Sequence, residues 1–161
     1  MQQHQQEIEF AIRLLVALVL GMVVGAEREY HRHPAGLRTM AMVSGGAALF
    51  TMVGEFSFGD LGKTDPTRIA AQVVTGVGFL GAGAIMRQGT DVKGLTTAAS
   101  IWVVAAIGMT AGFGSYLLAV MATTLVMIAL VLIRPLERRL FRRELREEAV
   151  DRERENDPGA L

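Results

Sequence analysis

The chain of 161 residues contains no cysteine. This absence excludes a disulfide framework, a thiol nucleophile and a cysteine-ligated metal site. The three histidines, His4, His31 and His33, do not have the spacing of a helical zinc site with a third ligand. No catalytic triad is visible either, so we expect a protein that is not an enzyme and carries no cofactor.

Charged side chains are scarce between Met40 and Ile133, although hydrophobic residues make up 51% of the chain and its mean hydropathy is +0.36. The charged residues in that stretch are Glu55, Asp60, Lys63, Asp65, Arg68, Arg87, Asp91 and Lys93. The net charge is zero, but the charges gather in short connections and in the C-terminal tail. A soluble domain distributes charge over its surface, whereas this partition is typical of a chain surrounded by lipid. It gives no indication of nucleic-acid binding.

Five apolar stretches have about the 17–25 residues that a membrane-spanning helix needs. They are Ile8–Val24, Met40–Phe58, Ile69–Met86, Leu95–Phe113 and Tyr116–Ile133. The first does not resemble a cleaved signal peptide, because it lacks a basic n-region and has Glu7 and Glu9 at its start. We therefore predict an all-α membrane protein with five transmembrane helices in residues 1–133. Residues 134–161 are predicted to form a charged cytoplasmic tail, an interfacial helix followed by a disordered end.

The distribution of lysine and arginine predicts the orientation of the spans. If the spans alternate in direction, the loop with Arg28, Arg32 and Arg38, the loop with Arg87 and Lys93, and the arginine-rich C-terminal flank lie on one side. Only Arg13, Lys63 and Arg68 lie on the other side. Because cytoplasmic loops carry the excess of basic residues, the N-terminus is expected outside and the C-terminus in the cytoplasm.

Two segments of the sequence, "AGLRTMA" (35–41) and "KGLTTAA" (93–99), are similar to each other. The same shift pairs Gly25 with Gly83 and Gly36 with Gly94. One interpretation is a parallel repeat of helical hairpins, which membrane proteins use. The alternative is that glycine- and alanine-rich helices match by chance. In both segments a threonine near the start of a span could cap the helix.

Glycine motifs lie inside the apolar stretches. "GVGFLG" (76–81) has the GxGxxG spacing, but it lies within a predicted span rather than between a strand and a helix, so we reject a dinucleotide site. "GMVVG" (21–25) and "GMTAG" (108–112) are GxxxG patterns, which allow helix backbones to approach closely. We expect close helix packing, within the subunit or across a dimer, at Gly21, Gly25, Gly78, Gly81, Gly108 and Gly112.

Polar residues predict one cluster near each membrane face. At the outer face Arg68 is expected to meet Glu55 or Asp65, with Gln72 extending the network; the alternative is a set of helix caps and snorkelling side chains. At the inner face, Glu27 is expected to pair with Arg38 or Arg87, next to Arg28. The alternative is that these charged residues only set the orientation of the spans. This alternative explains the arginines better than Glu27, because acidic residues contribute little to orientation.

Three segments of the chain resemble the membrane domain of the MgtC/SapB family of bacterial inner-membrane proteins. They are "GAEREYHRHPAGLRT", "DPTRIAAQVVTGVGFLGAGAIMRQG" and "VKGLTTAASIWVVAAIGM", in the order that the family has them. The family motif marks Glu27, Arg28, Pro34, Gly36, Leu37, Arg38, Asp65, Arg68, Gln72, Gly78, Gly81, Gly83, Gly94, Leu95 and Thr97. We take Glu27, Arg28, Arg38, Asp65, Arg68, Gln72, Thr96 and Thr97 as candidate binding residues and assign no metal site.

The resemblance implies a function linked to magnesium limitation and to survival inside host cells, for some members through binding and inhibition of ATP synthase. We therefore expect a regulatory or interaction protein that meets the lipid bilayer, ATP synthase or another membrane complex, and a second copy of itself. The alternatives are a transporter of magnesium or another ion and a homodimeric scaffold. No carboxylate lies near the middle of a predicted span, which weakens the transporter. Thr96 replaces an asparagine of some members, and several virulence-associated members have a soluble C-terminal domain, so the virulence association has less support.

Overall fold

The computed structural model describes residues 2–58, 67–133 and 135. The predicted tail 134–161, apart from Pro135, and the connection that contains Asp65 lie outside these residues. The chain divides into two units, Met1–Thr124 and Leu125–Leu161. The packing described below is that of the first unit.

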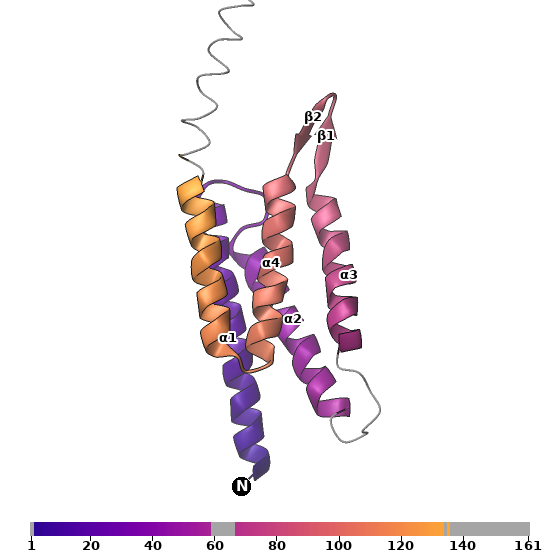
Figure 1. Cartoon of the computed structure of the whole chain (residues 1–161), viewed down its shortest axis with the longest axis vertical. Coiled ribbons are helices and arrows are strands. Elements are labelled where there is room, and N and C mark those ends of the chain that lie inside the picture. The colour runs from indigo at the N-terminus through magenta and orange to yellow at the C-terminus, as the bar shows by residue number, and fades with distance from the viewer. Residues whose placement is uncertain (1, 59–66, 134, 136–161) are drawn as a thin grey trace, which may run out of the picture. The chain divides into compact units, whose positions relative to one another are not determined.

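Helices account for most of the described chain. In order, the elements are α1 (Gln2–Tyr30), α2 (Leu37–Phe58), α3 (Thr67–Ala84), β1 (Met86–Gln88), β2 (Asp91–Lys93) and α4 (Leu95–Gly112), and a further helix spans Tyr116–Ile133 (Figure 1). Four of the helices are long and apolar enough to cross a membrane, and α3 contributes a shorter apolar segment, Arg68–Ala84. The prediction of a helical membrane protein is confirmed.

The first helix is longer than its apolar stretch. The sequence predicted a span that ends at Val24, but α1 continues to Tyr30. Glu27 and Arg28 on these last turns are buried, so packing against neighbouring helices keeps this segment helical after the apolar run has ended. The connection to α2 is therefore short, and Arg32 adopts a positive φ of 57° within it.

A small β-hairpin replaces part of a predicted span and loop. The stretch Ile69–Met86 was predicted as one helix, but α3 ends at Ala84 and Met86 pairs with Lys93 in an antiparallel ladder. Gly89, with φ 64°, supplies the positive backbone angle that a two-residue hairpin turn needs. Polar side chains across the hairpin also contact each other, since Lys93 Nζ donates to Gln88 Oε1 at 3.1 Å.

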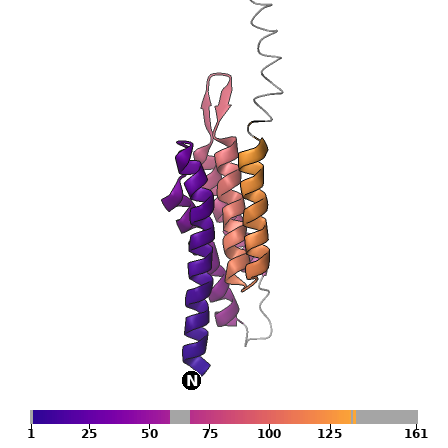
Figure 2. The ribbon, with the colours of Figure 1, turned by 90° about the vertical axis from the view of Figure 1, so that its left-hand side faces the viewer.

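The helices of the first unit run antiparallel, one after the other. The connection between α1 and α2 lies at the same end as the β1–β2 hairpin, which we call the hairpin end, and the start of α1 lies at the opposite end (Figures 1 and 2). Arg32 and Arg38 therefore share an end with Arg87 and Lys93, as the alternation of spans requires. Which side of a membrane this end faces stays a prediction.

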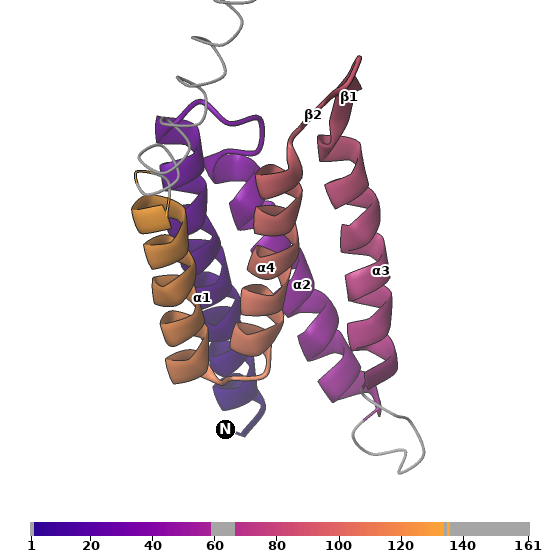
Figure 3. The same ribbon diagram turned by 45° about the horizontal axis from the view of Figure 1, so that its top comes forward.

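Helix α2 is the centre of the packing. It contacts α1 and α4 extensively and α3 only sparsely, while α3 packs mainly on α4. Figure 3 shows α4 in front of α2, with α3 to the right of both. Buried small side chains bring α2 close to its neighbours, and Ser44 Oγ donates to the carbonyl of Ala17 in α1 at 2.7 Å.

The two segments that suggested an internal repeat occupy similar positions. Gly36 directly precedes α2 and Gly94 directly precedes α4, and their carbonyls accept helical hydrogen bonds from Met40 and Ala98 at 3.0 and 2.9 Å. The N-cap of α4 is Gly94, with φ 92°, so Thr97 does not cap this helix. The connections that precede the two helices differ, and a duplication stays a prediction.

Candidate functional site

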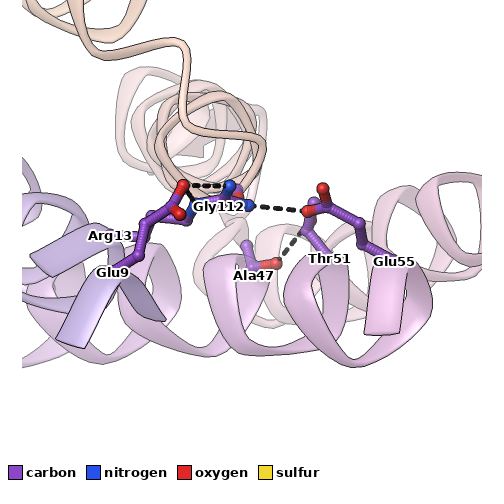
Figure 4. Close-up of polar contacts among 6 residues, drawn as sticks. All are labelled: Glu9, Arg13, Ala47, Thr51, Glu55 and Gly112. Atoms are coloured by element: carbon purple, nitrogen blue, oxygen red, sulfur yellow. Dashed lines mark hydrogen bonds and ion pairs between the residues drawn. The ribbon is translucent and has the colours of Figure 1, made fainter. Parts of the chain in front are cut away.

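Arg13 lies at the centre of a polar cluster in the N-terminal half of α1. Its Nη1 donates to Glu55 Oε2 of α2 at 2.6 Å and to the Gly112 carbonyl of α4 at 2.9 Å. Its Nε donates to Glu9 Oε1, one helical turn earlier, at 3.1 Å. Figure 4 shows the guanidinium group between the two carboxylates. We call Glu9, Arg13, Glu55 and Gly112 the Arg13 cluster.

The Arg13 cluster connects three helices at one point. The Arg13 side chain is only 10% exposed, whereas those of Glu9 and Glu55 are 53% and 47% exposed. Gly112 is the last residue of α4, where unpaired carbonyls and the helix dipole favour a cation. The buried cation thus has charged partners from α1 and α2 and a helix terminus from α4.

The partners in this cluster differ from those that the sequence predicted. Arg68 was expected to meet Glu55 or Asp65, but the partner of Glu55 is Arg13. Arg68 is exposed at the start of α3, and Asp65 lies outside the described residues. Sequence reasoning had treated Arg13 only as an orienting charge. The role of Arg13 could have been predicted from its position inside an apolar span, since an ionisable residue there needs a partner.

Replacing Arg13 is expected to loosen the connection between α1, α2 and α4. Arg13→Met removes hydrogen bonds from a charged donor, and we expect the free energy of unfolding to fall by about 1.5–3 kcal/mol. The half-exposed carboxylates can be solvated, which limits the loss. The measurement is thermal unfolding of the protein in mild detergent, with the exposed Arg68→Met as the matched control. Equal melting temperatures for the two variants would show that the Arg13 cluster does not stabilise the bundle.

A second buried cluster lies at the hairpin end of α1. Arg28 Nη2 donates to Thr97 Oγ1 of α4 at 3.2 Å, and Arg28 Nη1 lies 3.9 Å from Glu27 Oε2. His31 Nδ1 lies 2.9 Å from Glu27 Oε1. The side chains of Glu27 and Arg28 are only 5% and 3% exposed. We call Glu27, Arg28, His31 and Thr97 the Arg28 cluster.

The Arg28 cluster also differs from the predicted pairing. Glu27 was expected to pair with Arg38 or Arg87, but it contacts Arg28 and His31 instead. Arg38 is exposed near the start of α2, and Arg87 Nε donates to the carbonyl of Gly89 at 3.1 Å. A one-turn spacing on α1 brings His31 to Glu27, so local helical geometry determines this contact.

The other acid of the same segment, Glu29, has a role that the sequence did not suggest. Its Oε2 accepts a hydrogen bond from the backbone N–H of Leu37, the first residue of α2, at 2.8 Å. A carboxylate at a helix N-terminus satisfies a free N–H group and matches the helix dipole. Glu29 therefore connects the end of α1 to the start of α2.

The remaining candidate polar residues are more exposed. Thr96 is exposed, and its backbone carbonyl accepts a hydrogen bond from Ser100 Oγ at 2.7 Å. Gln72 is exposed on α3, and the hydroxyl of Thr75 donates to the Ala71 carbonyl at 2.9 Å within the same helix. The predicted network of Arg68, Gln72 and Glu55 is therefore not formed.

Four of the six predicted packing glycines lie at close contacts inside the subunit. A Cβ added at Gly21 would lie 2.6 Å from the Met40 carbonyl oxygen, and one at Gly25 would lie 2.6 Å from Leu37 Cα. Gly108 and Gly112 of α4 approach the backbone of α2 at Ser44 and Ala48. A Cβ at Gly81 would make only ordinary contacts with Ala98, and one at Gly78 would meet nothing within 4 Å. Gly78 is exposed on α3 and makes no close contact inside the subunit, so packing of this glycine across a dimer stays a prediction.

The two clusters can hold helices together electrostatically, and their acids already contact cationic or imidazole groups of the same chain. Within residues 2–58 and 67–133, no group of three or more histidine, aspartate or glutamate side chains is arranged to hold a metal ion. The chemistry that the described polar residues support is charge pairing and hydrogen bonding between helices.

Sequence comparisons identify bacterial relatives of the chain. It is 41% identical over 152 residues to Protein MgtC of Salmonella paratyphi A, an alignment that covers 94% of this chain and 64% of that protein. It is 44% identical over 138 residues to the Putative magnesium transporter YhiD of Escherichia coli K12, covering 83% of this chain and 64% of that protein. The chain thus spans just under two thirds of the length of these relatives. No solved structure shows a significant match. The model of the MgtC family matches residues 14–139, and the chain therefore belongs to the MgtC family.

Proposed function

We propose that this protein is an interaction protein of the bacterial inner membrane that acts under magnesium limitation by binding another membrane complex. The proposal involves no catalytic step and no cofactor. The resemblance to the MgtC/SapB family makes ATP synthase the first partner to test. The observation that carries the proposal is that the acids of both clusters contact positively charged or imidazole side chains of the chain itself.

This observation favours association over magnesium transport. Mg²⁺ requires near-octahedral coordination by oxygen ligands and gives up its water reluctantly. Glu9 and Glu55 both accept hydrogen bonds from Arg13, so an approaching cation would have to displace a guanidinium group that repels it. Glu27 is likewise adjacent to Arg28. These acids are therefore better suited to holding the helices together than to passing a cation.

The exposed arginines at the hairpin end offer a surface for a partner. Arg32 is exposed within the connection between α1 and α2, and Arg38 is exposed in the first turn of α2. Neither is part of the Arg28 cluster, so both can meet acidic groups of another protein without unfolding the bundle. In the proposed complex these arginines set the orientation of docking.

The test is co-reconstitution of the purified protein with a bacterial ATP synthase in liposomes. We expect ATP-driven proton pumping, measured with a pH-sensitive dye, to fall as the protein is added, while a magnesium-sensitive dye trapped in the same vesicles reports no uptake. Arg38→Gln should raise the concentration needed for inhibition by about fivefold, which corresponds to about 1 kcal/mol for one exposed ion pair. Arg68→Gln, an exposed arginine at the other end, is the matched control.

The outcomes separate the alternatives. Magnesium uptake with unchanged pumping would favour the transporter, an activity that the name of the E. coli relative assigns to that protein. Unchanged pumping without uptake would reject ATP synthase as the partner. Equal loss of inhibition in Arg38→Gln and Arg68→Gln would reject docking through the hairpin end.

A further inference from the structure

An apolar groove runs between α2 and α3, which contact each other only sparsely. Its volume is about 590 Å³, and its walls include Gly46 and Phe50 from α2 and Gly76 and Val77 from α3. Met42 and Phe50 of α2 and Leu80 of α3 line the groove and are 72%, 64% and 50% exposed, so in a membrane the groove is open to the lipid. A groove of this size between spanning helices can receive a side-chain ridge of another helix.

The groove contains one polar side chain, Gln72 of α3. Gly76 is the midpoint of the apolar segment Arg68–Ala84, and Gln72 precedes it by about 6 Å of helical rise, which keeps it within a hydrocarbon layer about 30 Å thick. The neighbouring Thr75 hydroxyl is satisfied within its own helix. The described part of the chain provides no hydrogen bond to the Gln72 amide. Lipid chains cannot provide one either, and an unsatisfied amide in hydrocarbon is unfavourable.

Two glycines of the groove are not explained by packing inside the subunit. A Cβ added at Gly46 or at Gly76 would meet nothing within 4 Å. Glycine inside a helix is less favourable than alanine, so these positions carry a penalty without a contact that requires it. In membranes, glycine at a helix surface allows another backbone to come close. The glycines therefore indicate that a helix, rather than an acyl chain, occupies the groove.

We propose that the occupant is a second copy of this chain, with α3 against α3 around a two-fold axis normal to the membrane. Copies inserted in the same orientation bring identical residues to the same depth. An amide has both a donor and an acceptor, so Gln72 can hydrogen-bond to Gln72 of the second copy. Phe79 is 82% exposed and lies two turns from Gln72 on the same face of α3, where it fills the partner's groove. A different protein could occupy the groove equally well only if it also placed a hydrogen-bonding side chain at the depth of Gln72.

Cysteine cross-linking in native membranes tests this interface directly, because the natural chain has no cysteine to interfere. We expect Gly76→Cys and Phe79→Cys, each as a single variant, to form covalent dimers on mild oxidation. Val74→Cys is the control, since Val74 is 44% exposed at a similar depth but on the other flank of α3. Equal cross-linking at Val74 would indicate random collision and overturn the proposal. It would also be overturned by the absence of dimers, as expected for a lipid-filled groove, or by cross-links to a different protein only.

Substitution of the open glycines tests the same surface without disturbing the monomer. Gly76→Leu should weaken association of the full chain in detergent by about tenfold, because the added side chain blocks the second copy. Gly78→Leu should leave association unchanged, since Gly78 is equally open but is not among the residues that line the groove. Gln72→Leu should weaken association and Gln72→Asn should retain part of it. Equal association for Gly76→Leu and Gly78→Leu would contradict the dimer, and this result does not depend on whether the protein binds ATP synthase.

Discussion

Arg28→Met is expected to lower the free energy of unfolding by about 3–5 kcal/mol, the usual effect of removing one partner of a buried ion pair. The carboxylate of Glu27 is 5% exposed and would remain buried without the adjacent guanidinium group. The hydrogen bond from Arg28 to Thr97 would also be lost, and with it a contact between α1 and α4. Methionine keeps much of the volume, so the change reports the loss of charge rather than a cavity. The measurement is thermal or denaturant unfolding of the purified protein in detergent.

Matched variants separate the ion pair from other effects. Arg38→Met replaces an exposed arginine near the same end and should change stability by less than about 0.5 kcal/mol. The double variant Glu27→Gln with Arg28→Met should recover a large part of the loss, because removing both partners of a buried pair is much less costly than removing one. A double variant that is less stable than Arg28→Met alone would show that the ion pair is not the source of the effect.

The number and approximate position of the helices could be predicted from the sequence because hydropathy alone carries that information. The stretches Leu95–Phe113 and Tyr116–Ile133 differ from the observed helices by at most one residue. The ends of α1 and α3 were less predictable. Glu27 and Arg28 continue α1 because α4 supplies a partner that hydropathy does not reveal, and the β1–β2 hairpin begins at an apolar residue, Met86, that looks like the end of a span.

The partners of the polar residues could not be predicted, because hydropathy does not determine how each helix is rotated about its axis. The predicted cationic partner of Glu55 was Arg68, which is closer in sequence, but the Glu55 carboxylate contacts Arg13 of α1, 42 residues away. The same limitation applies to the glycines. Gly78 and Gly108 both lie in small-residue motifs, yet one faces outward from α3 and the other contacts the backbone of α2. The sequence indicates which residues favour close approach and leaves open which neighbour approaches.

Replacing each of these two glycines by alanine should change the free energy of unfolding in opposite directions. Gly108→Ala places a methyl group against the Ser44 carbonyl, with Ser44 C at 2.7 Å and Ser44 Cα at 2.8 Å. Backbone atoms cannot move aside as a flexible side chain can, so we expect a loss at or above the upper end of about 1–3 kcal/mol for overpacking. Gly78→Ala meets nothing within 4 Å and should raise stability by up to about 1 kcal/mol through helix propensity. Thermal unfolding in detergent measures both, and a shift of the same sign in both variants would contradict the close contact of α2 and α4.

Ser44 makes the effect of Gly108→Ala larger than one contact suggests. A Cβ at Gly21 of α1 would lie 2.7 Å from Ser44 Cβ, so α2 is enclosed at this residue by a glycine from each neighbouring helix. The Ser44 hydroxyl also donates to the Ala17 carbonyl at 2.7 Å, which holds α2 against α1. If Gly108→Ala pushes α2 away from α4, the displacement presses Ser44 into α1, and Gly21→Ala presses it in the opposite direction. Because the two substitutions share one residue, the double variant should lose more stability than the sum of the single variants. An additive result would show that α2 can shift between its neighbours, and that the meeting of three helices at Ser44 is less rigid than the contacts imply.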